Sequence, residues 1–346
     1  MRLCYISRNY HNIHGAGDKA KTDIEATLAR MGAVNIGLAH STSTNKVVHF
    51  TRNLTGIIKA AFSLRQDDVL VLQYPLKKYY EWACNRAHGK GAKVITVIHD
   101  LGSFRRKKLS IEQEIARLSH SDIIVAHNEK MQAWLEEHGM QKPIVQLGIF
   151  DYLSPAPTHN DRPTPEEDSH YSIMFVGNMA ASLNKFLYDL GAQSQHTDYY
   201  LYGGHFEASL DPHNGHLKPQ GFAIDHELMN SNQGDFGLSW YGESLEFGQG
   251  KIGEYMAYNN PHKVSLYLRC ETPVILWNHA GLASFVQREQ CGLVVDSLVD
   301  LEAKLDAITP EQYAQLRANT RRVAQQIASG HYAEQAIRRS LSLLER

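Results

Sequence analysis

The sequence lacks the features that mark a membrane-spanning or exported chain. No run approaches the roughly 20 apolar residues that span a bilayer. The N-terminal MRLCYISRNY has no basic start followed by an apolar stretch, as a signal peptide would have. The net charge is only -2, which gives no reason to expect nucleic acid as a partner. These absences predict a cytoplasmic chain that binds no nucleic acid.

Cysteine pairs and the common cofactor motifs are also missing. The 4 cysteines are scattered, with no CxxC pair and no metal-like spacing. Cys4, Cys84 and Cys270 lie in apolar surroundings, which is typical of buried free thiols. No G-x-G-x-x-G opens either half of the chain, which disfavours a nicotinamide dehydrogenase. We therefore expect no resident cofactor.

Short apolar runs alternate with helical patterns along the whole chain. Apolar strands separated by helices indicate parallel sheets covered on both faces. The length suits two domains of about 150 residues each, so we predict an α/β protein with two doubly wound, Rossmann-like domains. The predicted strands are 3–7, 34–38, 69–74, 93–100, 122–128, 144–150, 171–178, 199–204, 236–242, 273–278 and 291–295. The predicted helices are 18–31, 53–64, 76–88, 109–119, 129–138, 261–270, 280–289, 297–306, 310–328 and 332–345.

A change of composition divides the two halves. Residues 154–169, SPAPTHNDRPTPEEDS, hold four of the 11 prolines and almost nothing to bury, which is typical of a linker. We predict an N-terminal domain over 1–153, a C-terminal domain over 170–330, and a last helix over 331–346 that packs back on the first domain or against a neighbouring molecule. Two such domains would face a cleft, with ligands bound outside the carboxyl ends of the strands.

The loop after the first strand is one candidate for ligand binding. In NIHGAGDKAKTDIEATL (12–28), Gly15 and Gly17 open a helix whose N-terminal amides could face an anion or a polar sugar. The spacing is not that of a Walker loop. A tight turn with Asp18 as a plain N-cap explains the same residues equally well.

Two polar residues end the strand of VIHDLGSFRRKK (97–108). His99 or Asp100 could be a general base or a sugar-binding group, or they could make a structural bond and a helix cap. The basic run 105–108 is either a solvated surface or an attachment to an anionic membrane leaflet. At the next strand end, Asn128 is predicted to be a helix N-cap.

The second half repeats the pattern of strand, glycine and helix. Gly177 ends one strand, and Lys185 in the helix beyond it could reach a phosphate. Tyr202 and Gly203 end the next strand, where the ring could stack on a nucleobase. Glu243 follows in a glycine-rich loop that is too polar to be buried without purpose.

The most informative stretch is EYMAYNNPHKVSLYLRCETPVIL (254–276). Pro261 suits the first turn of a helix, which places Asn260 at the N-cap. Lys263 would then lie in the first turn, where a cation opposes the helix dipole. An anion between this lysine and the helix amides would resolve the conflict, so the stretch predicts a diphosphate site. A solvated lysine is the alternative.

Several blocks resemble a known family. GEYMAYNNPHKVSLYLRCETPVILWNHAGLASFV, IFDYL (149–153), VGNMAASLNKFL and FGLSWYGES are similar to the bacterial galactofuranosyltransferases of O-antigen and capsule synthesis. These are close to the glucosyltransferases that extend GlcNAc on serine-rich adhesins. The resemblance spans nearly the whole chain and implies the GT-B architecture of two Rossmann-like domains.

The resemblance also implies ligand-binding positions. It implies a UDP-sugar donor bound by the second domain, with an acceptor-side and sugar-side loop in the first. The implied donor positions are Asn259, Asn260, Pro261, His262, Lys263, Val264, Ser265, Lys185, Tyr202, Gly203 and Gly177, and the first-domain loop carries Gly15, Gly17 and Lys19. Relatives often have Trp-Asp-Gly where this chain has Trp240-Tyr241-Gly242, so Glu243 would have to supply any acid needed there.

The implied chemistry is hexosyl transfer without a metal ion. Lys263 and the helix amides could stabilise the charge that develops on the leaving UDP, and the sequence has no Asp-x-Asp motif. Transfer of galactofuranose to a β-linkage from an α-linked donor inverts the anomeric carbon, which requires a general base. Asp100 is the first choice for this base and His99 the second.

Three functions remain open. The first is a galactofuranosyltransferase of surface polysaccharide or lipopolysaccharide synthesis, and the second is a UDP-glucose-dependent glucosyltransferase acting on a glycan or glycoprotein. The third is a non-catalytic scaffold that binds a nucleotide sugar. The sequence leaves open the acceptor (a glycan or a lipid-linked glycan), the oligomeric state and a peripheral association with the inner face of the cytoplasmic membrane.

Overall fold

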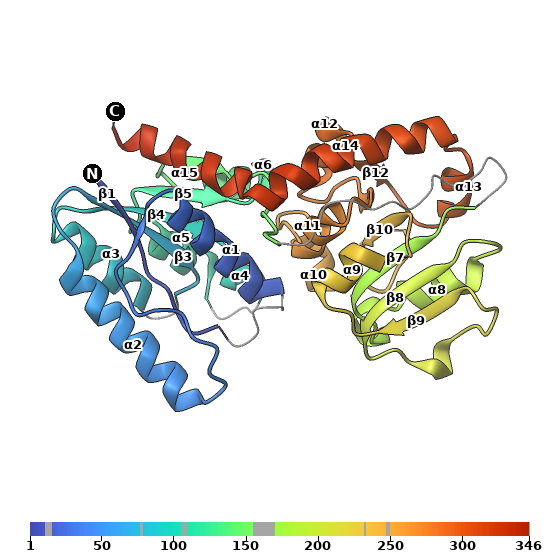
Figure 1. The fold of residues 1–346 in the computed structure, drawn as a ribbon, viewed down its shortest axis with the longest axis horizontal. Coiled ribbons are helices and arrows are strands. Elements are labelled where there is room, and N and C mark those ends of the chain that lie inside the picture. Colours follow the sequence, from blue (N-terminus) through green and yellow to red (C-terminus); the bar gives the residue numbers. More distant parts are fainter. Residues whose placement is uncertain are drawn as a thin grey trace. The chain divides into compact units, whose positions relative to one another are not determined.

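The computed structural model describes residues 1–10, 16–76, 79–105, 109–154, 170–231, 233–246 and 250–345. The chain divides into two compact units (Figure 1). The N-terminal unit comprises Met1–Asp151 and Gly330–Arg346, and the C-terminal unit comprises Tyr152–Ser329. Residues 155–169 of the predicted linker lie outside the described part. Each unit contains one six-stranded parallel sheet, so the predicted doubly wound α/β fold is confirmed.

The sheet of the N-terminal unit has the strand order β2-β1-β3-β4-β5-β6. Its strands are short and apolar, and β3 is buried along its whole length. Since every neighbouring pair is parallel, the carboxyl ends of all six strands lie at one edge. The strands are β1 (Arg2–Tyr5), β2 (Val34–Asn35), β3 (Asp68–Tyr74), β4 (Lys93–Ile98), β5 (Ile123–Ala126) and β6 (Ile144–Gln146).

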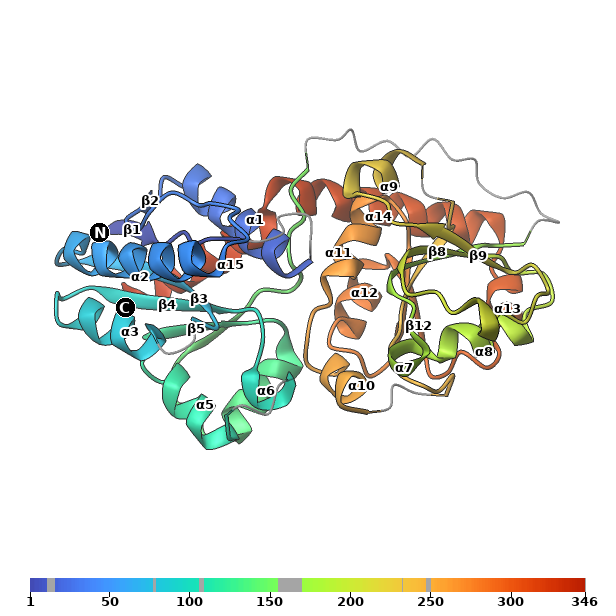
Figure 2. The same cartoon turned by 90° about the horizontal axis from the view of Figure 1, so that it is seen from below.

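Helices cover both faces of this sheet. On one face, α1 and α15 lie next to each other (Figures 1 and 2) and share one apolar cluster with β3, β4 and β5. On the other face, the Tyr80 hydroxyl of α3 hydrogen-bonds Thr96 of β4 at 2.8 Å. The helices are α1 (Ala16–Arg30), α2 (Lys46–Ser63), α3 (Tyr80–His88), α4 (Gly102–Arg105), α5 (Ile111–Leu118), α6 (Glu129–Glu137) and α15 (His331–Leu344).

The sheet of the C-terminal unit has the order β12-β11-β10-β7-β8-β9 and is also parallel throughout. Its apolar cluster joins the central strands to α8, α13 and Tyr313 of α14. The strands are β7 (Ile173–Asn178), β8 (Tyr199–Gly204), β9 (Leu217–Gly221), β10 (Phe236–Ser239), β11 (Val274–Trp277) and β12 (Gly292–Val295). The helices are α7 (Ala181–Asn184), α8 (Phe186–Gln193), α9 (Asp225–Ser231), α10 (Gly250–Met256), α11 (His262–Arg269), α12 (Ala283–Glu289), α13 (Leu301–Asp306) and α14 (Pro310–Ser329), with a 3-10 turn at Ala208–Leu210.

Local chemistry explains where prediction and structure agree. Asn128 caps α6, as predicted, because its side chain accepts a hydrogen bond from the Met131 amide at 3.0 Å. All four cysteines are buried and free. In α15, which was predicted as a helix over 332–345, Ile337 is buried in the apolar cluster, and Leu341 and Leu344 pack against it.

Two of the differences from the prediction have a clear cause. The edge strand β9 was not predicted, because its sequence LKPQG is polar and contains Pro219, which only an edge strand tolerates well. The helix predicted at 53–64 begins at Lys46 instead, where Asn45 accepts hydrogen bonds from the amides of Val47 and Val48. The helical turns of α2 before residue 53 were missed because their exposed apolar side chains do not follow the spacing of residues that face a core.

Candidate functional site

The first turn of α11 is held near the carboxyl ends of β7 and β10 by Tyr267. Its hydroxyl accepts a hydrogen bond from the Val176 amide (2.8 Å) and donates one to the Leu238 carbonyl (3.1 Å). The ring lies against Gly237, where a Cβ would come within 2.4 Å of Tyr267 Cγ. Glycine therefore lets the helix pack closely on β10. The start of α11 is fixed at the edge of the sheet where doubly wound folds bind ligands.

Lys263 lies in this first turn, with its ammonium between two aromatic rings. The Nζ atom is 3.9 Å from the centroid of the Tyr241 ring and 4.4 Å from that of Phe175. It has no ion-pair partner among the residues that the structure describes. Although the residue keeps some exposure, burial lowers the pKa of Lys263 to about 7. The protein thus holds a cation beside a helix N-terminus without a carboxylate to balance it.

The cap of α11 differs from the prediction. Pro261 is the N-cap, with φ -63° and ψ 124°, and no side chain caps the helix. Because the ψ of Pro261 is extended, α11 begins one residue later than predicted. Asn260 is therefore not the N-cap, and Pro261 is not in the first turn. The Oδ1 atom of Asn259 is buried and accepts no hydrogen bond from the described residues. A ligand with a donor group could satisfy this oxygen.

The other residues of the predicted diphosphate block have visible structural roles. His262 is stacked on Tyr152, with ring centroids 4.8 Å apart and 23° between the planes. The Val264 side chain is fully buried in the unit, and Ser265 is buried as well. Their side chains therefore belong to the packing that fixes the helix, and the prediction that they contact a ligand stays a prediction.

The ends of β7 and β8 approach each other closely. A Cβ at Gly203, whose φ is +140°, would lie 2.0 Å from the Gly177 carbonyl oxygen, so the strands need glycine here whatever binds beside them. Tyr202 is buried. Lys185 is exposed and pairs with Asp189 at 2.8 Å, so it would have to leave this ion pair to reach a phosphate.

The loop after β10 supplies an aromatic ring where relatives were expected to carry an acid. Trp240 is buried and donates a hydrogen bond from Nε1 to the Ser244 carbonyl at 2.9 Å, which fixes the loop. Tyr241 follows it and packs on the Lys263 ammonium. Glu243 is exposed. No carboxylate of the described part pairs with Lys263. Tyr241, which is uncharged, leaves the positive charge of Lys263 uncompensated.

The N-terminal unit contains a pocket of about 820 Å³. Its size is that of a small-molecule site. Aromatic rings and hydrogen-bonding side chains line it together, which suits a sugar. The residues that line it include Tyr10, Asp18, Lys21, Phe50, Asn53 and Tyr74.

Asp100 follows β4 near this pocket. Burial lowers the pKa of Lys21, and the charge of Arg8 lowers it further, whereas Asp18 and Asp100 raise it. Asp100 is thus close enough to act on a residue that lines the pocket. His99 is engaged elsewhere: its Nε2 lies 2.7 Å from the Gln73 side-chain oxygen. That nitrogen must donate to the oxygen, so it is not free to accept a proton.

The glycine loop before α1 is only partly described. Gly15 lies outside the described residues, and Gly17 is in the first turn of α1, where a Cβ would meet no atom within 4 Å. Lys19 is buried and bonds both carboxylate oxygens of Asp23 at 2.6 Å. Asp18 is not the N-cap, because the helix begins at Ala16; it pairs with Lys21 at 3.4 Å instead.

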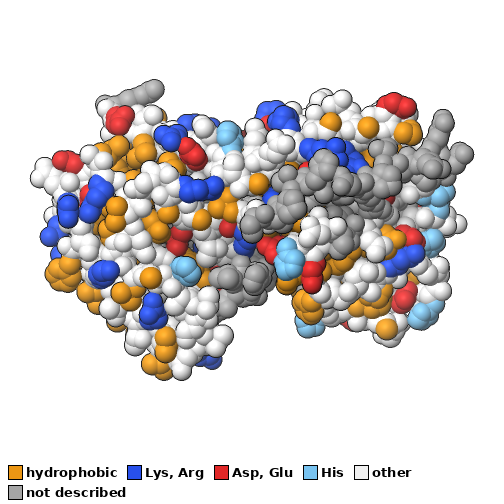
Figure 3. Space-filling model, viewed as in Figure 1, with side chains coloured by type: hydrophobic (Ala, Val, Ile, Leu, Met, Phe, Trp, Pro, Cys, Tyr) orange, Lys and Arg blue, Asp and Glu red, His pale blue; other side chains and the backbone are white. Residues whose placement is uncertain are grey.

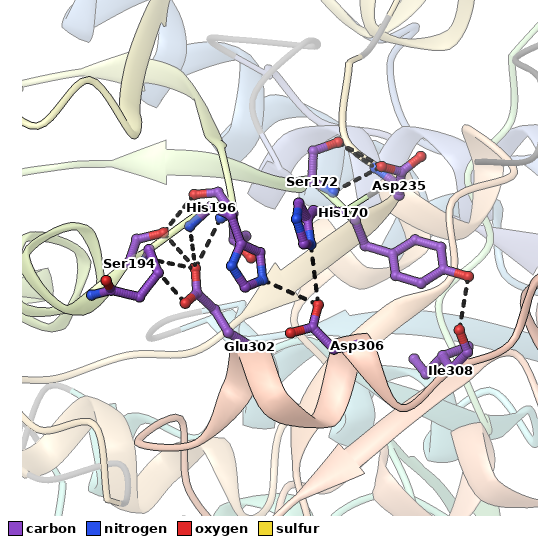
Figure 4. Close-up of polar contacts among 11 residues, drawn as sticks. His170, Ser172, Ser194, His196, Asp235, Glu302, Asp306 and Ile308 are labelled. Carbon is purple, nitrogen blue, oxygen red and sulfur yellow. Dashed lines mark hydrogen bonds and ion pairs between the residues drawn. The ribbon is translucent and has the colours of Figure 1, made fainter. Parts of the chain in front are cut away.

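One group of side chains in the described part has donor atoms close enough to share a metal ion. His196 Nε2 and His170 Nδ1 lie 3.1 and 3.4 Å from the same oxygen of Asp306 (Figure 4). However, the two imidazole rings are stacked, with centroids 3.6 Å apart and 30° between the planes. A metal bound by both rings must lie near the plane of each, about 2 Å from the nitrogen, and this stacking offers no such point. We interpret the group as an ion-pair cluster.

Solved structures share this two-unit architecture. The structure is similar to that of WaaG, a glycosyltransferase involved in lipopolysaccharide biosynthesis, with a TM-score of 0.52 and 12% identity. The match covers 96% of this chain and 98% of the WaaG chain. An alpha-glucosyltransferase in complex with UDP and DNA gives a TM-score of 0.51 at 12% identity over the full length of both chains. The fold is therefore GT-B, as expected.

The sequence comparisons identify the class of protein and its family. The N-terminal domain model of the glucosyltransferase 3-like family matches residues 3–149, and its C-terminal domain model matches residues 173–340. The chain is 31% identical to the beta-1,6-galactofuranosyltransferase WbbI of Escherichia coli (strain K12), over 78% of each chain. It is 23% identical to Glucosyltransferase 3 of Streptococcus gordonii, over 83% of this chain and 82% of that one. The chain belongs to the glucosyltransferase 3-like family and is a hexosyltransferase.

Sequence reasoning found Lys263 but missed what surrounds it. Phe175 and Tyr241 are 88 and 22 residues away along the chain, and no local pattern connects them to the lysine. The pocket residues Lys21 and Asn53 were missed for the same reason, since no local pattern in the sequence connects either of them to a ligand site. None of the described helices is both long and apolar enough to cross a bilayer.

Proposed function

We propose that this chain transfers galactofuranose from UDP-galactofuranose to a glycan acceptor in the synthesis of a bacterial surface polysaccharide, in the cytoplasm. The 31% identity to a galactofuranosyltransferase over 78% of each chain supports this donor. The proposal also accounts for the pocket of the N-terminal unit, which suits a sugar acceptor, and for the cationic start of α11, which suits a diphosphate.

The observation that carries the proposal is the environment of Lys263. Its ammonium touches two rings and no carboxylate of the described part. A diphosphate there would accept hydrogen bonds from the ammonium and the first amides of α11, and would be favoured by the helix dipole. We assign Asn259 to the same subsite, where its buried Oδ1 would accept a hydrogen bond from a hydroxyl of the donor. Tyr202 remains the proposed nucleoside contact.

The proposed reaction inverts the anomeric carbon in a single displacement. Asp100 accepts the proton of the acceptor hydroxyl while that oxygen attacks the anomeric carbon, and the bond to UDP breaks. Lys263 and the helix amides stabilise the negative charge on the departing diphosphate. The position of Asp100, two residues before Gly102 of the pocket lining, supports this role.

A second candidate is transfer of glucose from UDP-glucose. The match to Glucosyltransferase 3, which covers 83% of this chain, favours it. Two assays distinguish the donors. Each UDP-sugar is tested for displacement of labelled UDP from the protein and for hydrolysis by it, and the true donor should do both. Tight binding of UDP without hydrolysis or transfer would instead favour a non-catalytic scaffold.

The test is calorimetric titration of UDP, without divalent metal, into the wild type and Lys263→Ala. We expect the substitution to weaken binding at least tenfold, or about 1.4 kcal/mol. Lys218→Ala is the matched control, because this lysine of the same unit pairs with Asp198 at 2.5 Å, and it should bind UDP like the wild type. Equal affinities for wild type and Lys263→Ala would return Lys263 to a structural role and remove the proposed diphosphate site.

A further inference from the structure

The outer face of α2 exposes large apolar side chains. The helix buries Gly56, Ile57, Ala60 and Ala61 and turns the opposite side outward. Five of the 14 exposed large hydrophobic residues of the described part lie on this one helix. They are Val47 (70%), Val48 (38%), Phe50 (50%), Ile58 (41%) and Phe62 (74%).

The exposed residues form a stripe along the helix. Val47, Ile58 and Phe62 are separated by 11 and 4 residues, which are near whole numbers of helical turns. Thr51 and Thr55 complete the stripe and are exposed too. Single apolar residues on a surface need no explanation, but several of them aligned on one helix face indicate an interaction site.

The segment of chain that carries this stripe has charges of one sign. From residue 26 to residue 66 the chain has no Asp or Glu, although it carries five Lys or Arg residues. Lys59 and Arg52 of α2 are held by the carbonyls of Gly37 and Ala39, each at 2.9 Å. In the space-filling view, hydrophobic and basic side chains lie next to one another over α2, at the lower left (Figure 3). A basic, apolar helix in a chain of net charge -2 complements an anionic lipid surface.

We propose that α2 docks the protein on an anionic phospholipid membrane. Val47, Ile58 and Phe62 enter the boundary between headgroups and acyl chains, while the basic residues contact lipid phosphates. A helix with an apolar stripe, basic residues and no acidic residue has the composition of a helix that lies at a lipid interface. This surface is separate from the basic run 105–108, most of which lies outside the described residues.

Docking by α2 would also place the pocket of the N-terminal unit at the membrane. The same helix lines that pocket with His49, Phe50, Asn53 and Ile57, so the pocket and the apolar stripe share one element. We infer that the acceptor is a lipid-linked glycan, whose sugar enters the pocket while its lipid stays in the bilayer. This identification of the acceptor rests on the proposed function; the docking itself does not.

The test is co-sedimentation of the full chain with phosphatidylcholine vesicles, with and without phosphatidylglycerol. The wild type should bind the anionic vesicles, and added salt should weaken this binding. The double variant Ile58→Ser with Phe62→Ser should bind at least tenfold more weakly, since it removes two large apolar side chains from the interface. The matched control is Ile224→Ser with Phe222→Ser, a pair with similar exposure (42% and 87%) in the C-terminal unit, which should bind like the wild type.

Three results would overturn the docking proposal: no binding by the wild type, equal binding to neutral vesicles, or full binding by the α2 variant. Thermal melting and UDP titration check that the variant is folded. Transfer assays separate the two proposals. Docking is supported if the α2 variant loses transfer to an acceptor bound to vesicles but keeps full transfer to the same glycan without its lipid. Vesicle binding without transfer to either acceptor would contradict the proposed function and leave docking intact.

Discussion

The ammonium of Lys263 lies 3.9 Å from the centroid of the Tyr241 ring. Tyr241 stands where an acid was expected from the resemblance, and the replacement changes the electrostatics of the site. An aspartate would neutralise the lysine, whereas a ring attracts the cation through its quadrupole and leaves the net charge in place. The positive charge therefore remains available to an anionic ligand.

We expect the affinity for UDP to fall as pH rises above 7. Burial lowers the pKa of Lys263 to about 7, so the lysine loses its proton in the free protein as pH passes this value. A bound diphosphate stabilises the charged form, so binding above pH 7 requires uptake of a proton. The affinity should then drop by up to about tenfold per pH unit. Calorimetry at several pH values measures this directly.

The control for this pH dependence is Lys263→Gln, which cannot titrate. It should bind UDP weakly and with little change between about pH 7 and pH 9. The same slope in wild type and variant would show that another group is responsible, and would contradict the assignment of the titration to Lys263.

Tyr241→Asp should weaken the binding of UDP. The new carboxylate would lie next to Lys263, raise its pKa and compete with the diphosphate for its charge. We expect a loss of about tenfold near pH 7, together with a flatter pH dependence. Tyr241→Phe keeps the ring and should bind UDP almost as the wild type does. If Tyr241→Asp bound UDP more tightly, the ring would not be what keeps the site cationic.

Asp100→Asn should lower the turnover number and leave UDP binding unchanged. General base catalysis contributes roughly 10²- to 10⁴-fold to a rate, so we expect a loss of at least about a hundredfold. The measurement is steady-state transfer with saturating donor, alongside a UDP titration. His99→Asn is the comparison, because His99 Nε2 already binds the Gln73 side chain, and its effect should be smaller. Full turnover by Asp100→Asn would remove Asp100 from the role.

The sequence predicted the parts of this protein that depend on local patterns. The strand of residues 69–74 is apolar except for Gln73 because both its faces are buried, and this made the parallel sheet predictable. The position of Lys263 in the first turn of a helix was predictable from Pro261, and a cation there conflicts with the dipole. Both features are visible within one short stretch of chain.

The features that were missed depend on contacts between distant residues. Nothing near Lys263 in the sequence shows that Phe175 and Tyr241 enclose its ammonium. The first turns of α2 were missed because Val47 and Phe50 are apolar but exposed, so they break the core periodicity on which helix prediction depends. Gly203 was assigned to a nucleotide, yet the Gly177 carbonyl alone is enough to require a glycine.

Asp151 is expected to control the stability of the N-terminal unit. It belongs to the IFDYL block, and its carboxylate accepts hydrogen bonds from the amides of Tyr332 (3.2 Å) and Ala333 (2.7 Å) at the start of α15. Burial raises the pKa of Asp151 to about 7, although these bonds oppose the rise. The folded state therefore binds a proton that the unfolded state has already lost above pH 4 or so. The contribution of this group to stability should fall as pH rises from about 4 to about 7.

Thermal and urea unfolding at about pH 5 and about pH 8 test this prediction. Asp151→Asn keeps an acceptor but cannot ionise, so the loss of stability with rising pH should be smaller than in the wild type. Asp151→Ala removes both acceptors and should destabilise the unit by about 1–2 kcal/mol at either pH, as the loss of a helix cap does. If wild type and Asp151→Asn lost stability equally between the two pH values, the buried carboxylate would not be the titrating group. If Asp151→Ala unfolded like the wild type, α15 would not depend on this cap for its attachment.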